Sequence, residues 1–156
     1  MGVIGTQATI ESKAYEDAFA AAPQLELFTK SCPDFVHFVE RGETSGDSVT
    51  KAAEHYLSGL KSSGIDTLVL GCTHYPLLTG VISFVMGDGV TLVSSADETA
   101  KDLYRILVEK KLLRSSSNPP TYSFISSGNP EEFSNLARRF LGPEVLTVKR
   151  SDGSWQ

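Results

Sequence analysis

The feature that most constrains this chain is an unbroken apolar run that ends in a glycine and a cysteine. Residues 67–70 are all aliphatic or β-branched, a pattern typical of a strand buried on both faces in a parallel sheet. Gly71 then permits a tight turn, and Cys72 follows it. Open α/β sheets place their ligand crevice outside the carboxyl ends of the strands, so we predict that Cys72 lies at a functional site.

The residues after Cys72 favour the start of a helix. Thr73 is a plausible helix N-cap and Pro76 suits a first helical turn. A thiol near the positive end of a helix is favoured in its thiolate form. His74 adds a proton-handling group two residues away. The helix itself is predicted from apolar residues at helical spacing, namely Leu77, Leu78, Val81, Ile82 and Val85.

Strands and helices alternate along the rest of the chain, which predicts an α/β fold with a mostly parallel sheet flanked by helices. The segment 33–39 is ambiguous between a short helix and a loop. A long helix beginning at Ser95 or Asp97 is expected to turn Leu103, Tyr104 and Leu107 inward. The other expected strands are 2–5, 25–29, 90–93, 121–126 and 145–148, and the other expected helices are 12–20, 47–61 and 130–141.

Composition excludes several classes of function. The net charge of −5 comes without a basic stripe, which argues against nucleic-acid binding. No apolar run is long enough to span a bilayer and no signal peptide is visible, so the cytoplasm is the expected location, without a membrane partner. Cys32 and Cys72 form no disulfide framework, and with His37 and His74 they lack the spacing of metal ligands. No phosphate-binding Gly-Lys-Ser/Thr loop is present either.

Three ordered motifs resemble the aspartate/glutamate racemase family, and in particular its cofactor-independent glutamate racemases. The segment Gly71 to Pro76, Gly-Cys-Thr-His-Tyr-Pro, is similar to the second cysteine motif of that family. The segment 3–10 is similar to the start of the family's second domain, and the segment 32–40 is similar to the one that carries a functional glutamate, here Glu40. The resemblance implies a racemase-like, flavodoxin-like sheet over the early and middle parts of the chain.

The resemblance also implies a chemistry. One cysteine removes the α-proton of glutamate from one face, and a second returns a proton on the other face, without a cofactor or metal. Cys72 would be the thiol supplied here, with His74 and Glu40 as its catalytic partners and with Thr73, His74, Thr6 and Thr9 binding the substrate. In bacteria the family supplies D-glutamate for peptidoglycan synthesis. Taken alone, however, Thr6 and Thr9 are also ordinary strand-forming residues, and Cys32 is expected to be structural.

The family's first half, with its own Cys-Asn-Thr motif, is not in this sequence. The expected organisation is therefore a second racemase domain over residues 1–94, followed by residues 95–156, which would pack on the missing first domain. Residues 115–120 are the best linker candidate. The chain opens directly on a strand, which suggests that it begins inside a larger gene product. Its expected partners are glutamate, the missing amino-terminal half and a second copy in a homodimer, and the chain alone is expected to be inactive.

Other readings remain open at this stage. An aspartate racemase or a racemase of another amino acid would carry the same motifs. A Cys–His hydrolase or transferase would instead form a covalent adduct on Cys72. A non-catalytic remnant would keep the fold and bind a partner without needing the Cys72 thiol.

Overall fold

The computed structural model describes residues 1–153 and divides the chain into two compact units. The first unit spans Met1–Leu113 and the second begins at Arg114, within the polar stretch that was expected to be a linker. By its contacts, the helix after residue 94 belongs to the first unit. The expectation that residues 95–156 pack on another domain stays a prediction. Within the described residues, no helix has the length and apolar character needed to cross a membrane.

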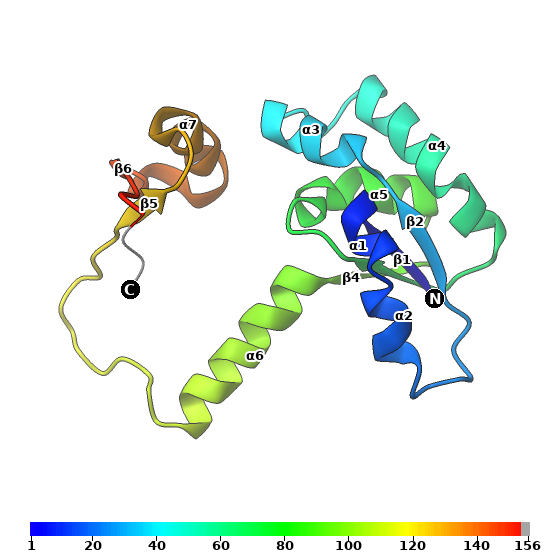
Figure 1. The fold of residues 1–156 in the computed structure, drawn as a ribbon, viewed down its shortest axis with the longest axis horizontal. Helices are drawn as coiled ribbons and strands as arrows, with labels where there is room; N and C mark the ends of the chain where they lie inside the picture. The colour runs from blue at the N-terminus through cyan, green and yellow to red at the C-terminus, as the bar shows by residue number, and fades with distance from the viewer. Residues whose placement is uncertain (154–156) are drawn as a thin grey trace. The chain divides into compact units, whose positions relative to one another are not determined.

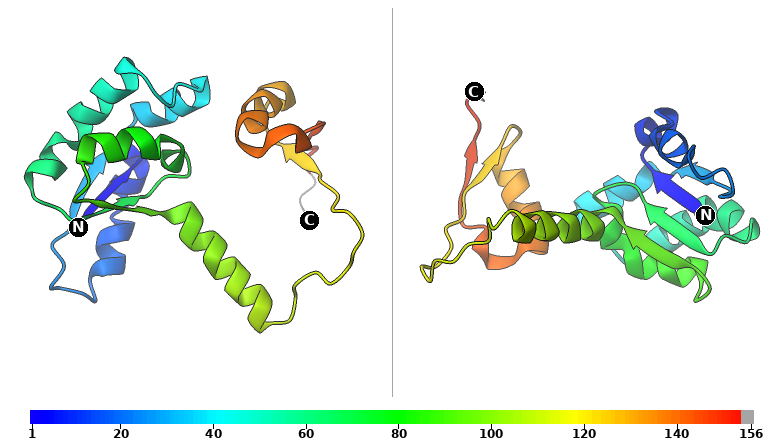
Figure 2. Two further views of the ribbon diagram at one scale, coloured as in Figure 1. Left: turned by 180° about the vertical axis from the view of Figure 1, so that it is seen from behind. Right: turned by 90° about the horizontal axis from the view of Figure 1, so that it is seen from below.

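The first unit is built on a four-stranded parallel sheet (Figures 1 and 2). Its strands lie in the order β2-β1-β3-β4, with Ile4 of β1 opposite Leu70 of β3 and Lys30 of β2. Pairing is parallel throughout, which confirms the predicted α/β class. The strands are β1 (Gly2–Gly5), β2 (Phe28–Ser31), β3 (Thr67–Leu70) and β4 (Thr91–Ser94).

Helices follow each strand of this sheet. The ambiguous segment after Cys32 is a helix, α3, and the helix predicted from the spacing of its apolar residues over 47–61 is α4. The expected helix over 12–20 is shorter, and a separate short helix before it was not predicted. The bounds are α1 (Gln7–Glu11), α2 (Ala14–Phe19), α3 (Asp34–Arg41), α4 (Asp47–Ser62), the 3-10 turn η1 (Tyr75–Leu78), α5 (Thr79–Met86) and α6 (Ser95–Glu109).

A single apolar cluster joins one face of the sheet to α3, α4 and α5. Leu68 and Leu70 of β3 are fully buried in it together with Phe35, Leu57 and Ile82. The prediction that β3 is buried on both faces is only half right, because its alternate residues, Thr67 and Val69, are partly accessible. Burial of aliphatic side chains at about 25 cal/mol per Å² is the main stabilising force for such a layer.

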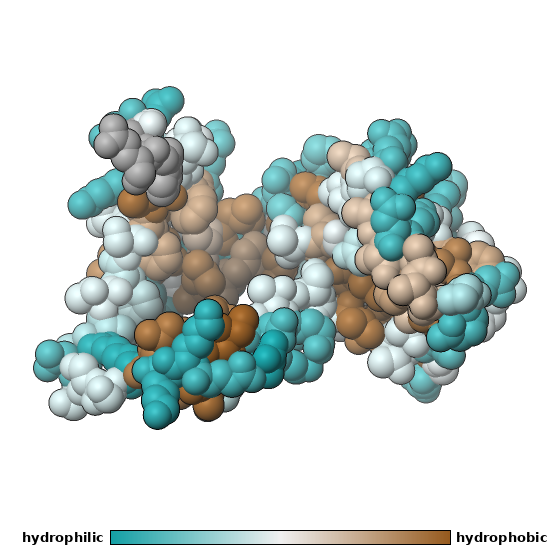
Figure 3. All heavy atoms as spheres, turned by 60° about the horizontal axis from the view of Figure 1, so that its bottom comes forward, coloured by the Kyte–Doolittle hydropathy of each residue, from teal (hydrophilic) through white to brown (hydrophobic). Residues whose placement is uncertain are grey.

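Helix α6 differs from the other long helices, because none of its residues is buried. The face that was predicted to turn inward is exposed: Leu103 is 56% and Tyr104 63% accessible, and only Leu107 is partly covered. Figure 3 shows hydrophobic surface lying among hydrophilic residues on this helix. Periodicity thus identified the apolar face correctly, but no described residue covers it.

The second unit is a small strand-helix-strand motif. Its strands are β5 (Phe124–Ser126) and β6 (Val148–Arg150), which pair in parallel, and α7 (Pro130–Leu141) and the turn η2 (Gly142–Glu144) connect them. Helix α7 has the predicted bounds, whereas β6 begins three residues later than predicted. Ala137 and Val145 are its buried hydrophobic residues, while Phe133, Phe140 and Leu141 of α7 remain exposed.

Candidate functional site

The candidate site lies where the strand order of the first unit reverses. The chain leaves β1 and forms β2 on one side of it, whereas β3 lies on the other side of β1. The carboxyl ends of β1 and β3 are therefore adjacent at the switch point, the position where open α/β sheets bind their ligands. The amide of Gly71 extends the pairing by donating to the carbonyl oxygen of Ile4 at 2.8 Å. Thr6 and Cys72 follow these two strands and so share one edge of the sheet.

Gly71 is required by a close approach of two neighbours. A Cβ atom on residue 71 would lie 2.9 Å from the carbonyl oxygen of Ile4 and 2.8 Å from the hydroxyl of Tyr15 in α2. Both distances are shorter than real Cβ atoms show, and the carbonyl belongs to the backbone. Tyr15 is thus a neighbour of the Cys72 loop that the sequence did not predict. No local pattern marks this contact, because α2 and Gly71 are far apart in the sequence.

Cys72 lies in a turn and is half-buried against the apolar cluster. Its carbonyl oxygen accepts a hydrogen bond from the amide of Tyr75 at 3.2 Å, which closes the turn. The predicted N-cap at Thr73 is wrong: η1 begins at Tyr75, no side chain caps it, and α5 starts only at Thr79. Pro76 does occupy the first turn of η1, as predicted. A 3-10 turn of four residues offers the thiol a weaker dipole than the predicted α-helix would.

His74 connects Cys72 to Glu40. Its Nδ1 lies 4.0 Å from the Cys72 sulfur and its Nε2 lies 3.6 Å from Oε1 of Glu40, which α3 supplies. The hydroxyl of Thr73 is also 3.4 Å from Nδ1, so it shares that ring nitrogen with the thiol. The side chains of His74 and Glu40 are 30% and 52% exposed, and a solvated pair of this kind contributes only about 0–1 kcal/mol. The pair therefore orients the imidazole but does little to hold the fold together.

Thr6 and Thr9 lie together at the end of β1. The hydroxyl of Thr6 accepts from the amide of Thr9 at 3.2 Å and so caps α1, and the two hydroxyls are 2.9 Å apart. Both side chains are partly accessible. On the other side of β3, the hydroxyl of Ser95 donates to the carbonyl oxygen of Leu70 at 2.9 Å. Hydroxyl groups thus follow three neighbouring strands, which suits a ligand with carboxylate groups.

Cys32 has the structural environment expected for it. It is fully buried in the apolar cluster, and this burial raises the pKa of its thiol to about 12. Its sulfur is 3.9 Å from the carbonyl oxygen of Lys30, a weak contact. Among residues 1–153, no group of three or more His, Cys, Asp or Glu side chains is arranged to hold a metal ion.

A surface pocket of the first unit lies away from this site. A cavity of about 510 Å³ runs between β2 and α4, where Lys30, His55 and Tyr56 are among its lining residues. Cys72 and His74 do not line it. The thiol therefore stands at an open edge of the sheet, where solvent reaches Thr73 and Glu40.

Comparisons with known proteins agree with the family that the motifs suggested. No family model matches the chain. A glutamate racemase of Beutenbergia cavernae is 62% identical over 157 residues, a match that covers 95% of this chain and 54% of the relative. A glutamate racemase of Corynebacterium diphtheriae is 54% identical and is covered over 58% of its length. The chain spans about half the length of the curated relatives it matches.

Solved structures give the same result. A glutamate racemase of Francisella tularensis, determined in complex with D-glutamate, matches 96% of this chain with a TM-score of 0.85 and 35% identity. The match covers 56% of that structure. A glutamate racemase from Bacillus anthracis gives a TM-score of 0.83 and 38% identity over a similar share.

Proposed function

We propose that this chain, which is homologous to the glutamate racemases over about half of their length, supplies one face of a glutamate racemase active site. In this proposal Cys72 exchanges a proton with the α-carbon of glutamate. The opposite face, with a second acid-base group, comes from the half of the relatives that this chain does not match. A carbanion formed on one face and protonated from the other inverts the stereocentre.

The observation that carries the proposal is the position of Cys72. It is a half-buried thiol at the switch point of a parallel sheet, and His74 and Glu40 lie in line behind it. A thiol has a pKa of about 8.5 in water, far below that of an amino-acid α-proton. The site must therefore stabilise the charge that develops as the proton leaves, and preorganised donors in an enclosed site do this best. Closing the open edge against a second domain would provide that enclosure.

Each remaining residue has a role that its position supports. His74 would hold a proton near the substrate carboxylate, and Glu40 would orient its ring through Nε2. The hydroxyls of Thr73, Thr6 and Thr9 would donate to the carboxylates of glutamate. Such donors favour the negative charge that accumulates during deprotonation. No step requires a cofactor.

The distal part of the chain would dock on the half of a racemase that this chain does not match. We propose that residues 95–156 form the surface that does so. Their exposed apolar residues support this, because Leu103 and Tyr104 of α6 and Phe133, Phe140 and Leu141 of α7 remain accessible.

Complementation tests the proposed function. The chain is mixed with a polypeptide comprising the unmatched half of the Beutenbergia cavernae relative, and L-glutamate is followed by circular dichroism and by exchange of its α-proton in deuterium oxide. We expect racemisation and exchange only in the mixture. Cys72→Ser should abolish both, whereas the matched variant Cys32→Ser should keep them. Full activity of the chain alone, or activity of the Cys72→Ser mixture, would refute the proposal.

A second candidate function is that of a thiol hydrolase or transferase. The arrangement of Cys72, His74 and Glu40 favours it, because a nucleophile, a base and an orienting carboxylate follow one another in space. It predicts an acyl adduct on Cys72 after incubation with an activated ester, detectable by mass spectrometry. The racemase predicts proton exchange without such an adduct during turnover. Mass spectrometry of Cys72 and the exchange of the α-proton of glutamate therefore distinguish the two functions.

A further inference from the structure

We propose that Tyr75 is a positioning residue that sets the geometry of His74 and Glu40 beside Cys72, acting through a buried hydrogen bond to the backbone of Cys32. This inference rests on the proposed roles of Cys72 and His74. It concerns a side chain that does not touch the reacting atoms. It is carried by contacts within the first unit alone.

The hydroxyl of Tyr75 joins two segments that are distant in the sequence. Tyr75 is fully buried, and its hydroxyl donates to the carbonyl oxygen of Cys32 at 2.8 Å. The same carbonyl accepts from the amide of Phe35 at 3.2 Å, at the first turn of α3. One backbone oxygen therefore ties the loop after β3 to the start of the helix that carries Glu40.

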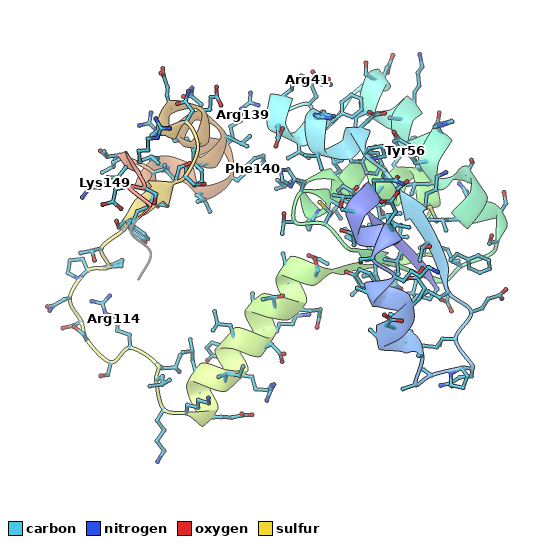
Figure 4. The ribbon with its side chains drawn as sticks, in the orientation of Figure 1. Arg41, Tyr56, Arg114, Arg139, Phe140 and Lys149 are labelled. Atoms are coloured by element: carbon cyan, nitrogen blue, oxygen red, sulfur yellow. The ribbon has the colours of Figure 1, made fainter. Side chains whose placement is uncertain are left out.

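Aromatic packing holds this connection, the buried joint formed by Tyr75, Phe35 and the carbonyl oxygen of Cys32, in place. The ring of Phe35 meets the ring of Tyr75 edge-on, with centroids 5.3 Å apart, and meets the ring of Tyr56 in the same way at 5.5 Å. Tyr56, labelled in Figure 4, reaches from α4 and donates to the carboxylate of Asp34, the first residue of α3. Offset and edge-on pairs are the favoured geometry for aromatic rings. Tyr75 thus ties α3 to the loop that carries His74, whereas Tyr56 ties α3 only to α4.

Direct contacts within the site hold its geometry only weakly. The 3.6 Å between Nε2 of His74 and Oε1 of Glu40 is longer than a direct hydrogen bond, and the 4.0 Å between the Cys72 sulfur and Nδ1 of His74 is at the outer limit for a contact with sulfur. Both His74 and Glu40 are accessible to solvent, which weakens their attraction. His74 precedes Tyr75 directly, and Glu40 lies on the helix that Tyr75 anchors. The relative placement of the two side chains therefore follows from the buried joint.

Alkylation of Cys72 tests the proposal without glutamate. The full chain carries Tyr75→Phe, which keeps the ring and removes only the hydroxyl, and iodoacetamide labelling of Cys72 is timed by mass spectrometry at neutral pH. Tyr56→Phe is the matched control, because it removes a hydroxyl from the other side of the same aromatic group. We expect Tyr75→Phe to slow labelling about threefold or more and Tyr56→Phe to change it less than twofold, since residues in one contact network couple at this level.

A double variant separates positioning from a general loss of structure. If Tyr75 acts through His74, then adding Tyr75→Phe to His74→Gln should not change the labelling rate further. The imidazole NMR signals give a direct readout: Tyr75→Phe should shift the signal of His74 and leave that of His55, on α4, unchanged. The proposal would be overturned if Tyr75→Phe left the labelling rate of Cys72 unchanged, or slowed it equally in the His74→Gln background. It would also be overturned if Tyr56→Phe had the same effect on that rate, or if the NMR signal of His74 did not shift in Tyr75→Phe. None of these results depends on racemisation, so they are distinct from failure of the proposed function.

Discussion

The cysteines that follow β2 and β3 differ in their burial. Cys32 comes directly after β2 and Cys72 comes two residues after β3, both at the carboxyl edge of one parallel sheet. After Cys32 the chain enters α3 at once, and Cys32 is fully buried in the apolar cluster that also contains Phe35 and Tyr75. After Cys72 the chain makes an open turn at the switch point between β1 and β3. Strand order and the local turn, and not residue type, therefore distinguish a structural thiol from a candidate catalytic one.

The largest expected difference between the two sites is in thiol reactivity. At pH 8 a thiol whose pKa is raised to about 12, such as that of Cys32, is ionised to only about one part in ten thousand. Complete burial of Cys32 adds steric protection, whereas Cys72 is partly accessible. We expect iodoacetamide to label Cys72 at least about a thousandfold faster than Cys32 in the native chain.

Peptide mapping after timed labelling measures both rates in one sample. In a denaturant the two cysteines should react at similar rates, which serves as the control. If Cys32 were labelled in the native chain at a rate similar to that of Cys72, the comparison would fail, because the packing around Cys32 would then have to open readily.

The second difference is in alkaline stability. The pKa of Cys32 is raised in the folded state, so its thiol contributes stability that is fully present below the unfolded pKa, about 9, and is lost as pH rises towards about 12. A shift of about three units corresponds to at most about 4 kcal/mol. We expect the free energy of unfolding of the native chain to fall more steeply over this window than that of Cys32→Ala, measured by urea titration at each pH. Parallel curves would contradict the assignment of that pH dependence to Cys32.

Much of the fold could be predicted from the sequence, because periodicity reports burial. The apolar spacing of α4 and α7 gave both helices with nearly correct bounds. Helix α1 was missed because five residues carry too little of a period to recognise. The apolar face of α6 was predicted as core and is exposed, since periodicity identifies a face but does not identify what covers it.

The candidate site was predictable in its motif and less so in its geometry. The glycine and cysteine after β3 lie at the carboxyl edge of the sheet, as predicted, and the structure brings His74 close to both Cys72 and Glu40, while the roles of these residues stay a prediction. The predicted cap at Thr73 was wrong, because Pro76 and the apolar residues after it form a 3-10 turn before α5 begins. The contributions of Tyr15 and Tyr75 were not visible, since both depend on tertiary contacts with distant residues.

The third prediction tests how tightly the end of β3 is packed. Gly71→Ala places a methyl group against the backbone of Ile4 and the hydroxyl of Tyr15, so the turn before Cys72 must shift. Such overpacking costs about 1–3 kcal/mol. The matched control is Gly59→Ala in α4, where an added methyl group meets no atom within 4 Å and should stabilise the helix slightly. Thermal unfolding monitored by circular dichroism measures both, and equal melting temperatures for the two variants would contradict the close approach.

The smallest expected effect on stability comes from replacing Glu40. This variant sharpens the comparison of the two cysteines, because it should change the labelling rate of Cys72 while leaving the free energy of unfolding almost unchanged. Glu40→Gln removes the charge that faces His74 from a solvated pair, so the free energy of unfolding should change by about 0–1 kcal/mol. Glu43→Gln is the matched control, because Glu43 forms an exposed pair with Arg41 at 2.7 Å near the end of the same helix. Both variants should therefore unfold at nearly the same urea concentration. Only Glu40→Gln should alter the labelling rate of Cys72, since it alone changes what orients the imidazole of His74, and an equal change in Glu43→Gln would assign the effect to the general charge of α3.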